Sequence, residues 1–170
     1  MKSVLLSLTL LLFSFGALAG EHYIPEDLQQ VEHIHHPTSE HFTAGQPTEQ
    51  EMGYFAEHGV RHVVNLRPPQ EAPEVNGAAW ASQHAMAYYH IPIAGGEDLT
   101  QEHVAVFDKI MQRIGDEKAL LHCGSSNRVG AMVALRGVWH QGMSEEEALQ
   151  LGREYGMTSL EEHVLKQLHH

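Results

Sequence analysis

Apolar and polar positions along this chain follow two patterns, short aliphatic runs and longer segments with a helical period. The short runs predict buried strands, which lie at 60–66, 88–93 and 118–123, with another beginning near Phe42. The longer segments predict helices, which lie roughly at 48–59, 73–87, 100–115, 128–141, 145–155 and 160–168. Strands that alternate with helices form βαβ units, so we expect one α/β domain with a mostly parallel central sheet flanked by helices.

Polar residues at the expected helix starts support these boundaries. Three S/T-x-x-E pairs have the spacing of a capping box: Thr48 with Glu51, Ser144 with Glu147, and Ser159 with Glu162. Thr100 precedes a segment whose apolar residues recur on one face of a helix, namely Val104, Phe107, Ile110, Met111 and Ile114.

The first nineteen residues have the features of a secretory signal peptide. Lys2 gives a positive start, an apolar run spans 4–15, and Ala17-Leu18-Ala19 is typical of a cleavage site. The run is too short to span a membrane. We therefore expect export to the periplasm or the medium, cleavage near Ala19, and no membrane insertion afterwards. A His-rich arm at 20–41 and one domain at 42–170 make up the rest.

Charge and histidine content limit the classes of partner. The net charge of −12 repels nucleic acid and anionic membranes, so we expect neither as a partner. The chain has fifteen histidines, and the arm includes His33, His35, His36 and His41, but their spacing matches no strong zinc signature. We therefore interpret the arm as a solvated polar segment, and we expect no cofactor and no specific metal.

The only cysteine, Cys123, lies in 121-LHCGSSNRVGAMVAL-135, between a predicted strand and a predicted helix. Ligands of parallel sheets bind beyond the carboxyl ends of the strands. The small polar residues Gly124, Ser125, Ser126 and Asn127 allow successive backbone N–H groups to turn inward, and the next helix directs its positive end to the same place. The segment therefore predicts an oxyanion site formed by these four residues.

The same surroundings act on the thiol. A thiol near a helix N-terminus and an arginine is deprotonated more easily than a free one, and a thiolate is a competent nucleophile. Arg128 can offer two parallel N–H groups to a phosphate, and His122 can orient Cys123. The alternative is a buried cysteine that packs as a small apolar residue.

These motifs together resemble the cysteine-dependent phosphatases of the dual-specificity type. More specifically, the chain resembles the phosphatase-like domain of bacterial β-lactamase-hydrolase-like proteins, in 42-FTAGQPT-48, 59-GVRHVVNLRPPQE-71, 88-YYHIPI-93, 122-HCGSSNRVGA-131 and 142-GMSEEEALQLGREYGMTSLEEHV-164. The resemblance implies a dual-specificity-phosphatase-like fold and hydrolysis of a phosphate monoester on a small molecule or a protein. Cys123 would form a phosphocysteine intermediate while the loop amides and Arg128 hold the phosphoryl oxygens.

The loop departs from the common phosphatase pattern in three ways. Four residues rather than five separate Cys123 from Arg128, a length found in rhodaneses, which carry sulfur as a persulfide. Ser126 stands where both families usually have glycine, so a positive φ there would be strained. Val129 stands where phosphatases usually place a hydroxyl that stabilises the departing thiolate. Two alternatives therefore stay open: a sulfurtransferase that uses Cys123 as persulfide carrier, and a catalytically weak anion-binding module.

Charged residues after two other strands complete the set of candidates. Asp98 follows the 88–93 strand, in the loop where the resembled phosphatases carry their general acid, and Glu97 is beside it. Both could instead be charges that favour the start of the next helix. Arg67 follows the 60–66 strand, where it either adds positive charge to the site or pairs with a carboxylate such as Glu71.

Overall fold

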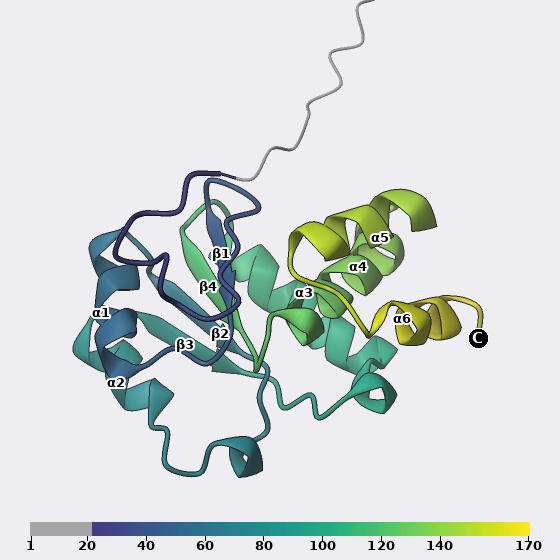
Figure 1. Ribbon diagram of the computed structural model, residues 1–170. Helices are drawn as coiled ribbons and strands as arrows, with labels where there is room; N and C mark the ends of the chain where they lie inside the picture. The colour runs from purple at the N-terminus through teal and green to yellow at the C-terminus, as the bar shows by residue number, and fades with distance from the viewer. Residues whose placement is uncertain (1–21) are drawn as a thin grey trace, which may run out of the picture.

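A computed structural model describes residues 22–170 of the chain (Figure 1). The signal peptide expected at 1–19 lies outside the described residues, so export stays a prediction. Among the described helices, none is long and apolar enough to span a bilayer.

A sheet of four parallel strands forms the centre of the domain. The strands are β1 (His41–Ala44), β2 (His62–Asn65), β3 (Ala87–His90) and β4 (Ala119–His122). They are ordered β1-β4-β2-β3, and every pairing is parallel. Because the strands are parallel, their carboxyl ends meet at one edge, and the interior strand β4 brings Cys123 to the middle of that edge. The predicted α/β domain with a parallel sheet is confirmed.

Helices cover both faces of the sheet (Figure 1). The described helices are α1 (Glu49–Glu57), α2 (Gly77–Gln83), α3 (Gln101–Ile114), α4 (Asn127–Gln141), α5 (Glu145–Glu154) and α6 (Glu161–Leu168), with short 3-10 turns η1 (Pro69–Glu71) and η2 (Gly96–Asp98). Val63 and Leu120 face the core under α1 and α2, whereas Val64 and Leu121 face the core under α3 and α4. This alternation follows from the two-residue period of a strand, and it explains why the short runs are apolar throughout.

The helix starts agree with the sequence in most places. Thr48 and Ser144 form complete capping boxes, and Thr100 accepts a hydrogen bond from the His103 N–H. The capping box expected at Ser159 is wrong, because α6 begins after Leu160 with no side-chain cap. The Ser159 hydroxyl instead accepts a hydrogen bond of 2.8 Å from Asn127 Nδ2.

The segment at 22–40 is part of the core, so its interpretation as a solvated arm is wrong. Leu28 is fully buried and Val31 is 3% exposed, and both pack in the cluster that contains Phe55. His58 Nε2 also lies 2.9 Å from a carboxylate oxygen of Asp27. Within residues 22–170, no three His, Cys, Asp or Glu side chains lie close enough together to hold a metal ion.

Candidate active site

Cys123 lies at the start of the loop that joins β4 to α4. Its N–H donates to the Ala44 carbonyl at 3.3 Å, which continues the β1–β4 pairing by one residue. The thiol has no exposed surface, so a ligand reaches the sulfur only when the atoms that cover it move aside. Behind the loop, the imidazole of His122 is fully buried, and burial lowers its pKa to about 3. His122 is therefore neutral at pH 7.

The loop turns into α4 through Ser126, whose backbone has φ of 61° and ψ of −14°. Such a conformation is strained for a residue with a Cβ, as expected from the presence of serine where related loops usually have glycine. Two features favour it here. The Ser126 hydroxyl donates to the His33 carbonyl at 2.9 Å. Gly156 packs beside it, and a Cβ on Gly156 would lie 2.4 Å from the Ser126 Cβ. The N-terminal segment thus supports the cysteine loop directly.

Other side chains in and next to the loop contact the protein itself. Asn127 Oδ1 accepts from the Thr158 N–H at 2.8 Å, and its Nδ2 donates to Ser159, so the amide ties α4 to the segment before α6. Val129 is fully buried in the core, and the Ser126 hydroxyl is engaged by His33. Backbone N–H groups and the exposed Ser125 hydroxyl remain for the anion site that the sequence predicted.

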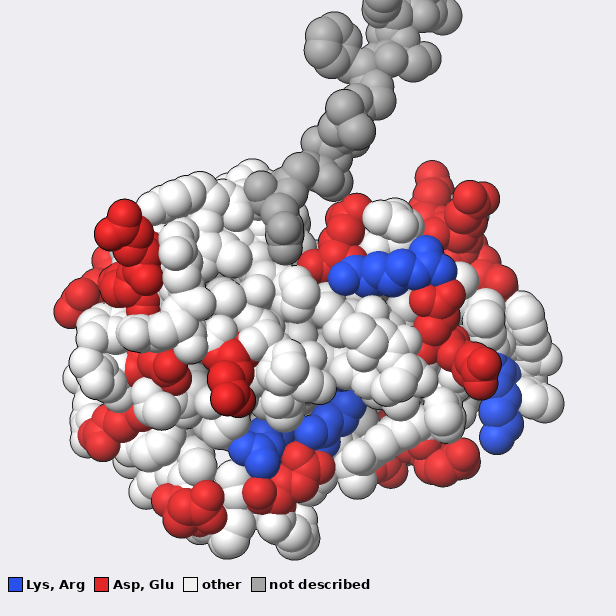
Figure 2. Space-filling model, viewed as in Figure 1, with Lys and Arg blue, Asp and Glu red and all other residues white. Residues whose placement is uncertain are grey.

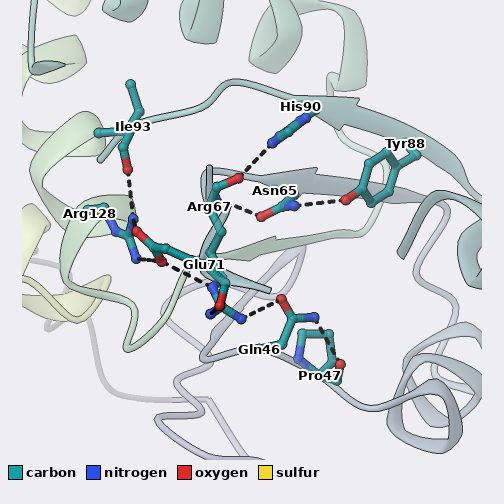
Figure 3. A network of polar contacts seen from close by, with 9 residues as sticks. All are labelled: Gln46, Pro47, Asn65, Arg67, Glu71, Tyr88, His90, Ile93 and Arg128. Atoms are coloured by element: carbon teal, nitrogen blue, oxygen red, sulfur yellow. Dashed lines mark hydrogen bonds and ion pairs between the residues drawn. The ribbon is translucent and has the colours of Figure 1, made fainter. Parts of the chain in front are cut away.

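Arg128 is anchored along one edge of its guanidinium (Figure 3). Its Nη1 donates to Glu71 Oε1 and to the Ile93 carbonyl, both at 2.7 Å, and its Nη2 donates to Glu71 Oε2 at 2.8 Å. The N–H of Nε and the second N–H of Nη2 lie on the opposite edge of the planar group. Nη2 is only 3.2 Å from the position of a Cβ on Gly124, so this second edge faces the cysteine loop.

The electrostatics of Arg128 follow from this position. Burial lowers its pKa, but the hydrogen bond to Glu71 and the nearby Cys123 sulfur raise the pKa by more, so that it is raised overall. Arg128 is therefore a permanent cation between the Glu71 carboxylate and the thiol.

Glu71 connects Arg128 to the second arginine of the site. Arg67 Nε donates to Glu71 Oε2 at 3.2 Å, which confirms the predicted pairing, and Arg67 Nη1 donates to Gln46 Oε1 at 2.9 Å. The hydrogen bond from Arg128 lowers the pKa of Glu71 against the opposing effect of burial, and Arg67 lowers it further. The Glu71–Arg128 pair was not predicted from the sequence. The sequence did contain one sign of this pair. Glu71 follows shortly after the predicted 60–66 strand, whose carboxyl end was expected at the same sheet edge as the cysteine loop.

Two guanidiniums and one carboxylate leave a local excess of one positive charge at this edge. Figure 2 shows several separate acidic patches on the visible face, with two neighbouring basic groups below its centre. A positive site in an acidic protein favours binding of a small anion over adsorption of a polyanion.

The acidic candidates after β3 have separate contacts. Asp98 Oδ2 accepts from the Ala94 N–H at 2.7 Å, in the turn that follows Ile93, whose carbonyl binds Arg128. Glu97 is 85% exposed and lies 3.8 Å from Lys166 of α6. The loop that contains Asp98 is therefore connected to Arg128 through Ala94 and Ile93. Glu97 instead lies near the C-terminal helix α6.

Taken with this geometry, sequence comparison identifies the class of protein. Residues 26–168 match the family described as a DSP-PTPase phosphatase fused to NAD+ kinase, so the chain belongs to that family. A curated relative, the β-lactamase hydrolase-like protein of Xylella fastidiosa, is 31% identical over 117 residues, which are 66% of this chain and 27% of the relative. The chain thus spans about a quarter of that protein's length, and the family suggested by the sequence motifs is confirmed.

Solved structures agree on the fold. A DUF442 protein from Shewanella putrefaciens CN-32, described as a candidate phosphatase, has a TM-score of 0.66 at 20% identity, over 84% of this chain and 95% of that one. P. aeruginosa TpbA in complex with pTyr has a TM-score of 0.60 at 14% identity, over 89% of each chain. The chain therefore has the fold of the dual-specificity-like cysteine phosphatases.

Proposed function

We propose that this protein is an exported phosphatase that hydrolyses a phosphate monoester through a phosphocysteine intermediate. The observation that carries the proposal is the anchoring of Arg128 by Glu71 and Ile93, because it leaves the second edge of the guanidinium facing the cysteine loop. That edge has two parallel N–H groups, which match two oxygens of a phosphoryl group. The family and the fold support the same chemistry.

The proposed reaction has two steps. The Cys123 thiolate attacks phosphorus, the bond from phosphorus to the ester oxygen breaks, and Asp98 gives its proton to the leaving oxygen. Water then attacks the phosphocysteine, its proton passes to the Asp98 carboxylate, and inorganic phosphate leaves as the thiolate is regenerated. Arg128 and the N–H groups of residues 124–127 stabilise the equatorial oxygens in both steps.

Hydrolysis of the intermediate is the step that this loop supports least. The departing thiolate normally gains a hydroxyl donor, but Val129 supplies none and the Ser126 hydroxyl is bonded to His33. We therefore expect phosphocysteine to accumulate during turnover. Acid quenching followed by mass spectrometry should find a phosphoryl group on Cys123, and a Cys123→Ser protein should carry none at that position under the same treatment.

Paired assays separate the proposal from its alternatives. Wild-type protein should release phosphate from p-nitrophenyl phosphate and form no thiocyanate from thiosulfate and cyanide, and Cys123→Ser should abolish the release. Thiocyanate alone would identify a sulfurtransferase, and inactivity in both assays would leave an anion-binding module.

Asp98→Asn should slow an alkyl phosphate far more than p-nitrophenyl phosphate, whose leaving group needs no proton; equal losses would remove Asp98 from the reaction.

Export is tested separately. Expression of the full chain in a bacterium should place the protein outside the cytoplasm, with a new N-terminus near residue 20. An intact N-terminus in the cytoplasmic fraction would contradict the signal-peptide assignment.

A further inference from the structure

A cleft of about 500 Å³ lies beside the cysteine site, between the carboxyl ends of β2 and β3 and the start of α2. It shares two residues, Arg67 and Gln46, with the network that anchors Arg128. Figure 3 shows one connected network, in which Arg128 lies on one side, Glu71 and Arg67 lie in the middle, and Tyr88 and His90 lie on the other side. A substrate whose phosphate lies at Arg128 therefore has this cleft within reach of its organic part.

The lining of the cleft differs from the rest of the protein in charge. The chain has 22 acidic residues, but none of the described residues that line the cleft is an aspartate or a glutamate. Three prolines, Pro68, Pro69 and Pro73, supply apolar C–H surface beside the polar residues of the lining. Apolar walls with a few directed polar groups are typical of small-molecule sites.

Several polar side chains that line the cleft keep unused hydrogen-bond donors. Arg67 uses three of its five N–H groups in its bonds to Glu71 and Gln46, so two are left. Asn65 Nδ2 donates to the Tyr88 hydroxyl at 2.8 Å, which leaves one N–H on Asn65 and the O–H of Tyr88 for a ligand.

These donors, the charge balance and the apolar walls point to one class of ligand. An unsubstituted aryl group would leave the donors without acceptors when it displaced their water, at a free-energy cost for each. A second phosphate would lack a counter-charge, because Glu71 already offsets one of the two arginines and the protein is acidic overall. A polyhydroxylated group offers acceptor oxygens without charge, and its C–H surface can pack on proline.

We infer that this cleft binds the polyol or sugar part of a phosphate monoester whose phosphate lies at Cys123 and Arg128. The inference rests on the proposed function for the position of the phosphate, and it deepens that function by naming the substrate class. Arg67, Asn65 and Tyr88 bind the hydroxyl oxygens, while Arg128 binds the phosphate.

Binding to the full-length Cys123→Ser protein tests the cleft without the need for turnover. Calorimetry should find that a hexose 6-phosphate binds about tenfold more tightly than either inorganic phosphate or phosphotyrosine. Ala78→Phe places a large side chain in the cleft from the exposed first turn of α2, and it should lower the affinity for the hexose phosphate about tenfold. Ser82→Phe, on the same helix but outside the lining, is the matched control and should stay within about twofold of the parent.

These results test the ligand class of the cleft and the proposed phosphatase function separately. Tighter binding of phosphotyrosine or of a hexose bisphosphate would overturn the inference, as would an Ala78→Phe protein that keeps the parent affinity. A folded Ala78→Phe protein is verified by an unchanged affinity ratio of inorganic phosphate to sulfate and by its circular dichroism spectrum. If the hexose phosphate binds as expected but wild-type protein releases no phosphate from any ester, the proposed function fails and the cleft stands as a binding site.

Discussion

Replacing Glu71 by glutamine tests whether this carboxylate positions Arg128. Glutamine keeps one oxygen acceptor, but its NH2 group faces a guanidinium nitrogen, so one of the bonds of 2.7 and 2.8 Å is lost and the other is no longer between charges. Hydrogen bonds to charged groups contribute about 1.5–3 kcal/mol, and neutral ones about 0.5–1.5 kcal/mol. Since the Glu71 side chain is 33% exposed, solvent screening reduces the difference to about 1–2 kcal/mol.

That free energy corresponds to a loss of about 5- to 30-fold in kcat/KM for p-nitrophenyl phosphate. The loss should appear in kcat, because removing a negative charge from the site favours binding of the anionic substrate and holds KM level or lowers it. Steady-state kinetics of the wild-type, Glu71→Gln and Glu74→Gln proteins provide the assay, with the exposed Glu74 as control. A Glu71→Gln protein within twofold of wild type in kcat would refute the positioning role.

Three further predictions concern stability. Ser126→Ala keeps the strained backbone and loses the bond to the His33 carbonyl, so urea denaturation should show a loss of about 1–2 kcal/mol. Gly130→Ala would place its Cβ 2.3 Å from a backbone oxygen of α5 and should cost about 3 kcal/mol or more, whereas Gly95→Ala meets nothing within 4 Å and should be nearly neutral by the same assay. His41 and His122 have pKa values lowered by burial to about 4 and about 3, so each is neutral when folded but protonated when unfolded below pH 6.5. The free energy of unfolding should therefore fall by up to about 2.7 kcal/mol per pH unit as the pH drops from 6.5 to 4, and His122→Leu should halve that slope; a slope unchanged by the substitution would contradict the assignment.

Local patterns predicted those parts of the fold that depend on neighbours in the chain. Apolar runs located all four strands, and side-chain spacing predicted the capping boxes at Thr48 and Ser144. The same spacing gave a wrong capping box at Ser159, because Asn127, which is 32 residues away in the chain, donates to that hydroxyl. The arm was misread for a similar reason. Leu28 and Val31 are isolated apolar residues in a polar segment, and their burial depends on the shape of the surface they meet.

The sequence alone determined the class of this protein and the position of its central loop. A lone cysteine between a buried strand and a helix, followed by small polar residues and an arginine, fixes a site at the carboxyl edge of a parallel sheet. Only the tertiary structure decided how that site is held. The Glu71–Arg128 pair, the bond from Ser126 to the N-terminal segment and the acid-free cleft beside Arg67 all join residues that are far apart in the chain. Periodicity and spacing report on contacts within a few residues, whereas these contacts exist only after the strands have paired and brought their ends to one edge.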